Sequence, residues 1–265
     1  MPTSDSPSRR PAGVPSLERA LTVLECLAQS RKGYSVSELS RRLELPKSSV
    51  HLILRTFERR GYLYKQATGG RYRFGLKLVS LGRMALEGVE IRDEAKPVLA
   101  RLVRATGLTA HMGILERNEV VIVERLESAS PIRVVSFVGR RMHVHSTAVG
   151  KALAAYLPES DLLSHMGDGP LPRANERTTV VVAEFRRELD RVREQGFALN
   201  DEEDELGVRS VGAPILNSEG VSVASISVVG TTGQIPLERV PALGLAVKTA
   251  AAEISARVQK MHAFA

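Results

Sequence analysis

The chain has 265 residues and a mass of 28.9 kDa, with 43% hydrophobic and 25% charged residues. These are ordinary values for one or two globular domains, and they exclude a wholly disordered chain. Its single cysteine, Cys26, excludes an internal disulfide and a cysteine-rich zinc site.

The net charge of +7 is concentrated at one end of the chain. Residues 1–75 hold 14 Lys or Arg and 6 Asp or Glu (14 − 6 = +8), whereas residues 76–265 hold 23 and 24 (23 − 24 = −1). A basic excess confined to one segment favours a polyanion such as a nucleic acid as its partner. No apolar leader and no apolar run of membrane-spanning length occur, so we expect a cytoplasmic protein with no membrane partner.

The N-terminal segment begins with a polar stretch and then turns helical. Residues 1–15 contain four prolines and predict a flexible tail. The spacing of apolar residues predicts a helix from Ser16, with Cys26 in the core. We expect the inward face of this helix to hold Leu17, Leu21, Leu24 and Ala28.

Two further helices and a hairpin follow. Ser35-Val-Ser-Glu38 has the spacing of a capping box and predicts the start of a second helix. Pro46 suits the first position of a third helix, and Gly69-Gly70 separates two strand-like runs. Three short helices and a basic hairpin predict a winged helix-turn-helix over residues 16–75. The predicted inward residues of the third helix are Val50, Ile53, Leu54 and Phe57.

The remainder of the chain predicts a linker helix and a second domain. The linker helix covers residues 76–92, with a kink or break near Gly88–Arg92, and residues 93–265 form an α+β domain. Its predicted helices are Ala148–Tyr156, Asp161–Met166, Ala183–Glu194 and Val240–Val258. Its predicted strands are Thr109–Leu115, Glu119–Leu126, Arg133–Val138, Phe197–Leu199, Val208–Leu216 and Val221–Val229.

The third helix has the residues of a DNA-reading helix. In a helix-turn-helix, the N-terminal residues of the second helix of the motif face base edges in the major groove. Aromatic residues make up only 4% and Trp is absent, which favours duplex DNA over single-stranded RNA, whose bases stack on aromatic rings. For base contacts we predict Lys47, Ser48, Ser49 and His51. Arg55 lies further along the same exposed side and is also predicted to bind DNA. For phosphate contacts we predict Arg41, Arg42, Lys65, Arg71 and Arg73, with plain solvated surface as the alternative for each arginine.

Several long motifs occur in a fixed order along the chain. They are Ser16-Leu-Glu-Arg-Ala-Leu-Thr-Val-Leu-Glu25, Leu45-Pro-Lys-Ser-Ser-Val-His51, His145-Ser-Thr-Ala-Val-Gly-Lys-Ala152, Gly196-Phe-Ala-Leu-Asn-Asp-Glu-Glu203 and Gly207-Val-Arg-Ser-Val-Gly-Ala-Pro-Ile215. With these motifs the sequence resembles the IclR family of bacterial transcription regulators. The resemblance implies a winged-helix domain, a linker helix and a GAF-like effector-binding domain. It also implies homodimers, or tetramers, that bind double-stranded operator DNA as repressors under the control of a small molecule.

The resemblance also implies a set of effector-binding residues. They are Met142, Ala148, Val149, Asn200, Val208, Ser210, Ser227 and Val229. Asn200, Ser210 and Val229 differ from the acid, Cys and Ser of some family members, so the identity of the effector does not carry over. Alternation predicts that Val221, Val223, Ser225, Ser227 and Val229 share one face of a strand.

The start of the helix after Thr147 is a second indication of a ligand. Free backbone N–H groups and the helix dipole there favour an anion, such as the carboxylate of a small aliphatic or aromatic acid, with Gly150 at the contact. The alternative is a tight turn in which Gly150 serves packing alone.

Other chemistry has weaker support in the sequence. The acidic run Asp201–Glu205 has three alternative interpretations: a metal site, an acid–base cluster or a solvated loop. His143 and His145, joined by His111 or His165, offer a zinc site. Motifs for nucleotide binding, zinc proteases and serine hydrolases do not occur. We therefore assign no catalytic residue, metal or cofactor, and keep a small-molecule enzyme or a metal-binding sensor as the alternative.

Overall fold

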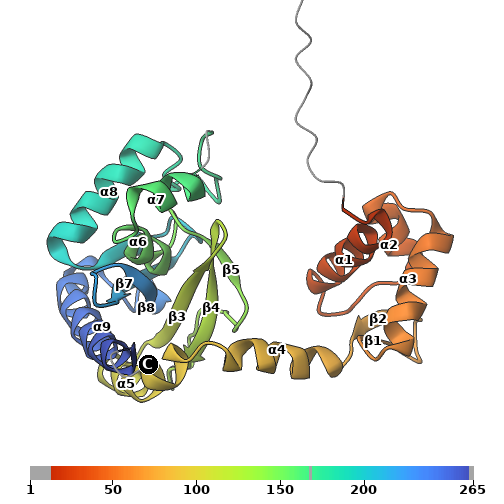
Figure 1. Cartoon of the computed structure of the whole chain (residues 1–265), viewed down its shortest axis with the longest axis horizontal. Coiled ribbons are helices and arrows are strands. Elements are labelled where there is room, and N and C mark those ends of the chain that lie inside the picture. The colour runs from red at the N-terminus through yellow and green to blue at the C-terminus, as the bar shows by residue number, and fades with distance from the viewer. Residues whose placement is uncertain (1–12, 167–168, 263–265) are drawn as a thin grey trace, which may run out of the picture. The chain divides into compact units, whose positions relative to one another are not determined.

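The computed structural model describes residues 13–166 and 169–262. These residues form two compact units, which divide between Gly88 and Val89 and are labelled by their elements in Figure 1. Most of the tail predicted at residues 1–15 lies outside the described residues. The first helix begins at Pro15, one residue before the predicted start.

The first unit confirms the predicted winged helix-turn-helix. Three helices are followed by a two-stranded antiparallel hairpin and a fourth helix. Backbone N–H of Glu38 donates to the Ser35 hydroxyl (3.3 Å), and Ser35 N–H donates to the Glu38 carboxylate (2.7 Å), which completes the capping box. The elements are α1 (Pro15–Ala28), α2 (Val36–Leu43), α3 (Lys47–Arg59), β1 (Leu63–Lys65), β2 (Tyr72–Phe74) and α4 (Lys77–Glu87).

The inward face of α1 differs from the predicted one. Leu17 and Leu21 are 56% and 44% exposed and Ala28 is exposed, so these three assignments are wrong, whereas Leu24 is half-buried. The buried residues of α1 are Val23, Cys26 and Leu27. The apolar residues of α1 form two adjacent stripes along the helix. The stripe of Val23, Cys26 and Leu27 packs into the core, whereas the stripe that contains Leu17 and Leu21 faces solvent.

The second unit is a six-stranded antiparallel sheet between two layers of helices (Figure 1). The strand order is β5-β4-β3-β8-β7-β6. Helices α5 (Ile91–Thr106) and α9 (Val240–His262) pack on one face, and α6 (Ala148–Ala154), α7 (Glu159–Met166) and α8 (Val182–Gln195) cover the other. The strands are β3 (Thr109–Glu116), β4 (Glu119–Leu126), β5 (Arg141–His143), β6 (Ala198–Asp201), β7 (Val208–Leu216) and β8 (Ser222–Thr231). The predicted break before residue 92 is confirmed, because α4 ends at Glu87 and α5 begins at Ile91.

The strand predicted at Arg133–Val138 is wrong, because this segment has no strand partner. The edge of β4 is occupied by β5 and by Arg140, whose carbonyl accepts the N–H of Ile122 (3.0 Å). The carbonyl of Val135 instead accepts a hydrogen bond from the Arg140 side chain (3.1 Å). The segment is therefore held by side chains rather than by a strand ladder.

The predicted alternation in β8 fails at its first residues. Leu216 pairs with Ser222 and Ile215 with Ala224, so Val223 is an extra residue in a β-bulge. The Ser222 hydroxyl donates to the carbonyl of Leu153 in α6 (2.6 Å), whereas Val223 is 39% exposed. The face shared by Ser225 and Ser227 thus continues through Ser222, and the assignments of Val221 and Val223 to that face are wrong.

Among the described residues, none of the helices combines the length and apolarity needed to cross a bilayer.

Candidate nucleic-acid interface and ligand cavity

Helix α3 presents a polar face on the side away from the core. Val50 and Leu54 are fully buried, whereas the predicted base-contacting residues are exposed, except for Ser49, which is half-buried. Leu52, which the sequence reasoning missed, is 69% exposed on this helix. The sequence does indicate that Leu52 is exposed, because it falls outside the inward spacing of Val50, Ile53, Leu54 and Phe57. The exposed residues are Lys47, Ser48, His51, Leu52, Arg55, Thr56 and Arg59.

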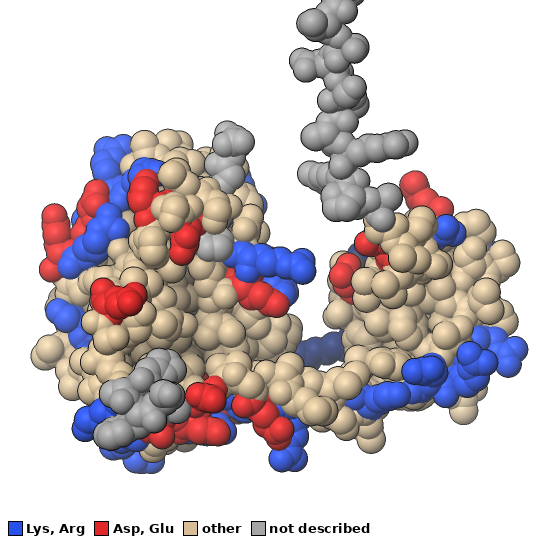
Figure 2. All heavy atoms as spheres, viewed as in Figure 1, with Lys and Arg blue, Asp and Glu red and all other residues tan. Residues whose placement is uncertain are grey.

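The other predicted DNA-binding residues fall into two groups. Arg41, Arg55, Lys65 and Arg73 are exposed, as is Arg42, whose guanidinium lies 5.7 Å from the centre of the Tyr34 ring. Figure 2 shows Lys and Arg side chains gathered at the edge of this unit where α3 ends and the hairpin lies in Figure 1. These cations are accessible to a polyanion.

Arg71 is the exception and binds within the protein. Its guanidinium donates to the carbonyl of Gly33 (2.8 Å) and to the carboxylate of Glu38 (2.5 Å). Hydrogen bonds from Ser35, followed by those from Arg71, lower the pKa of Glu38 and keep this carboxylate charged. Arg71 thus ties the hairpin to α2, and its role as a phosphate contact stays a prediction.

A small cavity in the second unit lies between α6 and the sheet. It has a volume of about 20 Å³ and brings together seven of the nine residues predicted to bind an effector. We call it the central cavity. The seven residues are Met142, Val149, Asn200, Val208, Ser210, Ser227 and Val229.

Strand register explains why these residues meet. Asn200 of β6 is paired with Ser210 of β7, which is paired with Val229 of β8. Paired residues point to the same face of a sheet, so these three side chains form one row across it. His111 pairs with Ser227 in a second row. All five lie on the face that α6 covers.

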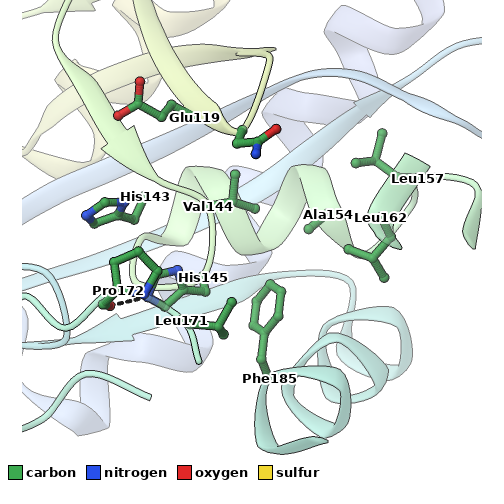
Figure 3. Close-up of a pocket in the computed structure, with 11 residues that line it drawn as sticks. Glu119, His143, Val144, His145, Ala154, Leu157, Leu162, Leu171, Pro172 and Phe185 are labelled. Carbon is green, nitrogen blue, oxygen red and sulfur yellow. Dashed lines mark hydrogen bonds between the residues drawn. The ribbon is translucent and has the colours of Figure 1, made fainter. Parts of the chain in front are cut away.

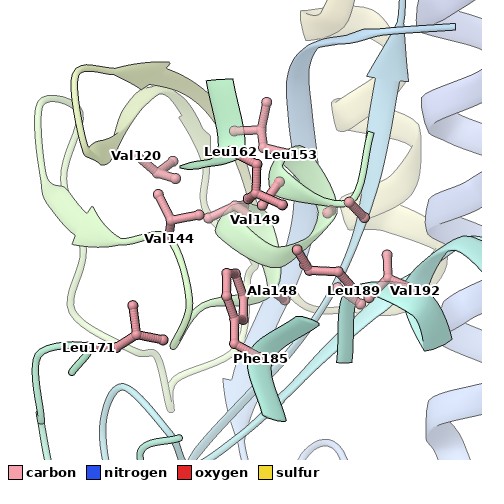
Figure 4. Close-up of a cluster of buried hydrophobic side chains, with 14 of the residues drawn as sticks. Val120, Val144, Ala148, Val149, Leu153, Leu162, Leu171, Phe185, Leu189 and Val192 are labelled. Carbon is pink, nitrogen blue, oxygen red and sulfur yellow. The ribbon is translucent and has the colours of Figure 1, made fainter. Parts of the chain in front are cut away.

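Ala148 and Gly150, also predicted to bind an effector, do not line the central cavity. Ala148 is fully buried with Phe185 and Leu189 in the core cluster on that face of the sheet (Figure 4). A Cβ atom at Gly150 would lie 2.2 Å from the carbonyl oxygen of Val144, and the Gly150 N–H already donates to the Thr147 hydroxyl (3.1 Å). Gly150 therefore permits close packing, which is the alternative stated for it.

The central cavity contains charged and polar residues that the sequence reasoning did not assign to it. Arg140 forms an ion pair with Asp204 (3.2 Å), and His111 shares a hydrogen bond with Ser136 (2.6 Å). Burial lowers the pKa of His111 to about 3, and the charges of Arg125 and Arg140 act in the same direction. His111 is therefore neutral near pH 7. The residues missed are His111, Val134, Arg140, Thr147, Asp204 and Glu205; only the acidic run and the N-cap Thr147 carried a sequence signal.

Comparisons with known proteins agree with this geometry. The family pattern described as IclR helix-turn-helix domain matches residues 16–67, and the pattern described as Bacterial transcriptional regulator IclR C-terminal matches residues 83–256. The chain belongs to the IclR family of bacterial transcriptional regulators.

Individual IclR-family relatives match over most of their length. The regulator XynR of Escherichia coli K12 is 35% identical over 222 residues, which span 84% of this chain and 88% of XynR. The repressor AllR of the same strain is 28% identical over 243 residues, or 92% of this chain and 90% of AllR. A crystal structure of an IclR homologue from Microbacterium hydrocarbonoxydans, complexed with 4-hydroxybenzoate, has 26% identity and a TM-score of 0.76 over 92% of this chain and 99% of that chain.

The acidic run of this IclR-family protein is a set of ion pairs. A solvated loop does not describe it, because four of its five residues are half-buried and each of those four has a cationic partner. Lys151 of α6 is 1% exposed and lies between Glu203 (2.7 Å) and Glu188 of α8 (3.5 Å). The other pairs are Asp201–Arg209, Glu202–Arg177 and Asp204–Arg140.

The histidines predicted as zinc ligands have other partners in the structure. The rings of His143 and His145 are 5.5 Å apart, and His145 Nε2 shares a hydrogen bond with the carbonyl of Pro172 (2.8 Å). His111 is bound to Ser136 in the central cavity, and the side chain of His165 lies outside the described residues. Among the described residues, no three side chains of metal-binding type come together.

His143 and His145 instead border a pocket of about 290 Å³ on the other side of β5. The histidines lie at one end of this pocket, and Leu157 and Leu162 lie at the other (Figure 3). Phe185 of α8 forms part of its apolar wall. Met142 lines the central cavity and His143 lines this pocket, because neighbouring residues of a strand point to opposite faces.

The Lys151 ion pair generates a stability prediction. Replacing Lys151 with Met leaves the Glu203 carboxylate buried without its partner, so we expect a loss of about 3–5 kcal/mol in the free energy of unfolding. Urea unfolding of the full chain, followed by circular dichroism, measures this loss.

Two further variants make the test specific. Adding Glu203→Gln to Lys151→Met removes the unpaired charge and restores part of the stability. The same Lys→Met change at exposed Lys260 alters stability by less than about 0.5 kcal/mol. If Lys151→Met were as stable as Lys260→Met, the ion pair would not hold this region together.

Proposed function

We propose that this transcriptional regulator binds operator DNA as a repressor through α3 and the β1–β2 hairpin, and that a small organic acid in the central cavity controls its affinity for DNA. Residues 16–75 would form the DNA-binding domain, residues 76–92 the linker helix and residues 93–265 the effector-binding domain. The observation that carries the proposal is the convergence of seven residues, from four strands and α6, on one cavity in a chain with an IclR helix-turn-helix domain.

On the DNA side, the proposal divides the exposed residues by role. Phosphate contacts supply most of the affinity without reading sequence, and Arg41, Arg42, Arg55, Lys65 and Arg73 would provide them. Base contacts specify the operator, and Lys47, Ser48, Ser49 and His51 would make them from the start of α3. Leu52 adds an apolar surface suited to the methyl group of thymine.

On the ligand side, the walls of the central cavity favour an acid. They combine apolar side chains with the hydroxyls of Ser210 and Ser227, the amide of Asn200 and the guanidinium of Arg140. The homologue complexed with 4-hydroxybenzoate supports the same class of ligand. A volume of about 20 Å³ suffices for about one water molecule, so an organic acid enters only if the cavity opens. Control of DNA affinity then follows from different affinities of the acid for the closed and open conformations.

We further propose that the functional form is a homodimer, which two-fold repeated operators require, and that dimers pair into tetramers. None of the residues of α4 is buried, and Leu76, Val79 and Met84 are 84%, 67% and 70% exposed. An 11-residue helix with no packed face has little stability of its own, so a second copy of the chain would cover it. Such a regulator acts in the cytoplasm on its DNA and releases its ligand unchanged.

The DNA contacts lead to a prediction about salt dependence. Arg55→Ala should weaken binding to operator and random duplexes alike, because it removes a phosphate contact. The slope of log K against log salt concentration should fall by about 0.9 for each subunit bound. Fluorescence anisotropy between 50 and 200 mM salt, on a genomic fragment selected by the protein, measures this slope. The exposed Arg187 of α8 is the matched control, and an unchanged slope for Arg55→Ala would contradict the contact.

The ligand proposal predicts binding of carboxylic acids. Titration calorimetry with 4-hydroxybenzoate, benzoate and butyrate should detect binding of at least one acid, and that acid should change operator affinity by about 5–150-fold. Ser227→Val removes a hydroxyl from the cavity and should weaken binding about 3–10-fold. The proposal fails if none of the acids gives heat and none alters DNA binding.

The dimer proposal predicts the effect of a charge on α4. Val79→Glu places a carboxylate in the proposed interface, so the protein should sediment as a monomer at micromolar concentration and lose most of its operator affinity. Ser164→Glu, at an exposed position of α7, should leave both properties unchanged. Sedimentation velocity measures the oligomeric state of the two variants. A dimeric Val79→Glu protein would exclude α4 from the interface.

A further inference from the structure

The central cavity has one cationic side chain among the described residues that line it. Arg140 is that residue, since the other ionisable groups are His111, Asp204 and Glu205. The lowered pKa of His111 keeps its ring uncharged near pH 7. A carboxylate that enters the cavity therefore finds a single counter-charge there, the Arg140 guanidinium.

In this structure the guanidinium of Arg140 is bound by groups of the protein. It lies 3.2 Å from a carboxylate oxygen of Asp204 and 3.9 Å from one of Glu205, and it donates to the carbonyl of Val135 (3.1 Å). Short bidentate pairs are the strongest arrangement of Arg with a carboxylate, and the single 3.2 Å contact with Asp204 is not of that kind. Burial raises the pKa of Asp204, against the opposing effect of Arg140, so moving this carboxylate into water recovers part of its lost hydration.

The Arg140–Asp204 pair joins two walls of the cavity. Arg140 ends the irregular segment that precedes β5, and Asp204 lies in the loop between β6 and β7, 64 residues further along the chain. Small-molecule sites in proteins usually enclose about 300–1,000 Å³, whereas this cavity has about 20 Å³. A ligand with a ring or a short aliphatic chain fits only if the two walls separate, and the ion pair is one of the contacts between them.

The segment that leads to Arg140 is packed less tightly than the sheet, whereas the backbone of Gly139 and Arg140 is hydrogen-bonded to Ile122 of β4 (2.7 and 3.0 Å). Val134 and Ser136 point inward, but Ile132, Val135 and Phe137 are each more than 60% exposed, and the segment has no strand ladder. Segments with few buried contacts open at lower free energy than a packed sheet.

The wall that carries Asp204 is tied to α6. The neighbouring Glu203 is paired with Lys151 of α6. A displacement of Asp204 therefore also affects the ion pair that holds α6, the helix that covers the sheet.

We propose that Arg140 is the residue that binds the carboxylate of the effector, and that the Asp204 carboxylate occupies this position until the acid displaces it. Asp204 then acts as an internal competitor: it sets the concentration of acid needed for a response and disfavours neutral analogues, which offer no charge in exchange. This inference rests on the proposed binding of an organic acid in the central cavity. It adds the residue that recognises the charge and the residue that opposes binding.

The test compares acids with their amides. Titration calorimetry on the full chain uses 4-hydroxybenzoate, benzoate and butyrate, each against its neutral amide. The wild type should prefer the acid. Arg140→Gln should bind the acid about 10–100-fold more weakly and the amide within about threefold of the wild type. Asp204→Asn should bind the acid at least threefold more tightly than the wild type, because the amide of Asn does not compete as a charge.

Controls separate recognition from folding. Arg133→Gln changes an exposed arginine of the same segment, paired with Glu127, and should leave acid binding unchanged. Arg140→Lys retains the charge and should preserve part of the preference for acid over amide. Operator affinity without acid, together with circular dichroism, verifies that each variant is folded.

The opposite signs of the two main variants exclude a purely structural role. If the pair only stabilised the fold, Asp204→Asn and Arg140→Gln would both weaken binding, and this outcome would overturn the inference. An acid that binds the wild type and Arg140→Gln equally well would overturn it while leaving the proposed function intact. A wild type that binds no carboxylate would instead refute the ligand part of the proposed function, and this inference with it.

Discussion

The buried positive charge of Lys151 organises α6 and its neighbours in the second unit. The ammonium of Lys151 is almost completely removed from water, and burial of a charge costs several kcal/mol unless it is paired. Its partners Glu203 and Glu188 come from the β6–β7 loop and from α8. The need to neutralise Lys151 therefore holds α6, the acidic loop and α8 together. Because α6 and that loop form two walls of the central cavity, the ion pair also helps to set the shape of that cavity.

Arginine has different roles in the two units. In the second unit most arginines named above are paired with carboxylates, as Arg209 is with Asp201 and Arg140 with Asp204, which agrees with a net charge near zero over residues 76–265. In the first unit Arg55 and Arg73 are exposed, and Arg71 is the one that stabilises the hairpin through Glu38. An accessible cation attracts a polyanion, whereas a paired one orders the protein around it.

The central cavity and the pocket of about 290 Å³ lie on either side of one short connection. Met142 lines the central cavity, and His143, Val144 and His145 line the larger pocket. Thr147 caps α6 and also donates to the carbonyl of His143 (2.9 Å), so the connection is fixed to the helix. This contact restrains β5 relative to α6.

Local patterns determined much of this protein before any tertiary structure was considered. The capping box at Ser35, the inward spacing of α3, the hairpins and most helices of the second unit depend on residues close in sequence, and they were predicted correctly. The family motifs identified seven residues of the central cavity because each lies in a regular strand or at the start of α6. The orientation of α1 was not predictable, since two adjacent apolar stripes satisfy the same helical period.

Only the tertiary structure decided features that depend on contacts between distant residues. The segment around Ser136 has the alternation of a strand, but β5 occupies the edge that it would need. The internal partners of Arg71, Glu38 and Gly33, are 33 and 38 residues away in the sequence, so no local pattern indicates them. Arg140 and Asp204 are 64 residues apart, and no periodicity links them. Sequence patterns determine which face of an element is apolar, whereas the pairing of charges depends on how the elements pack, because electrostatic partners are chosen by distance in space.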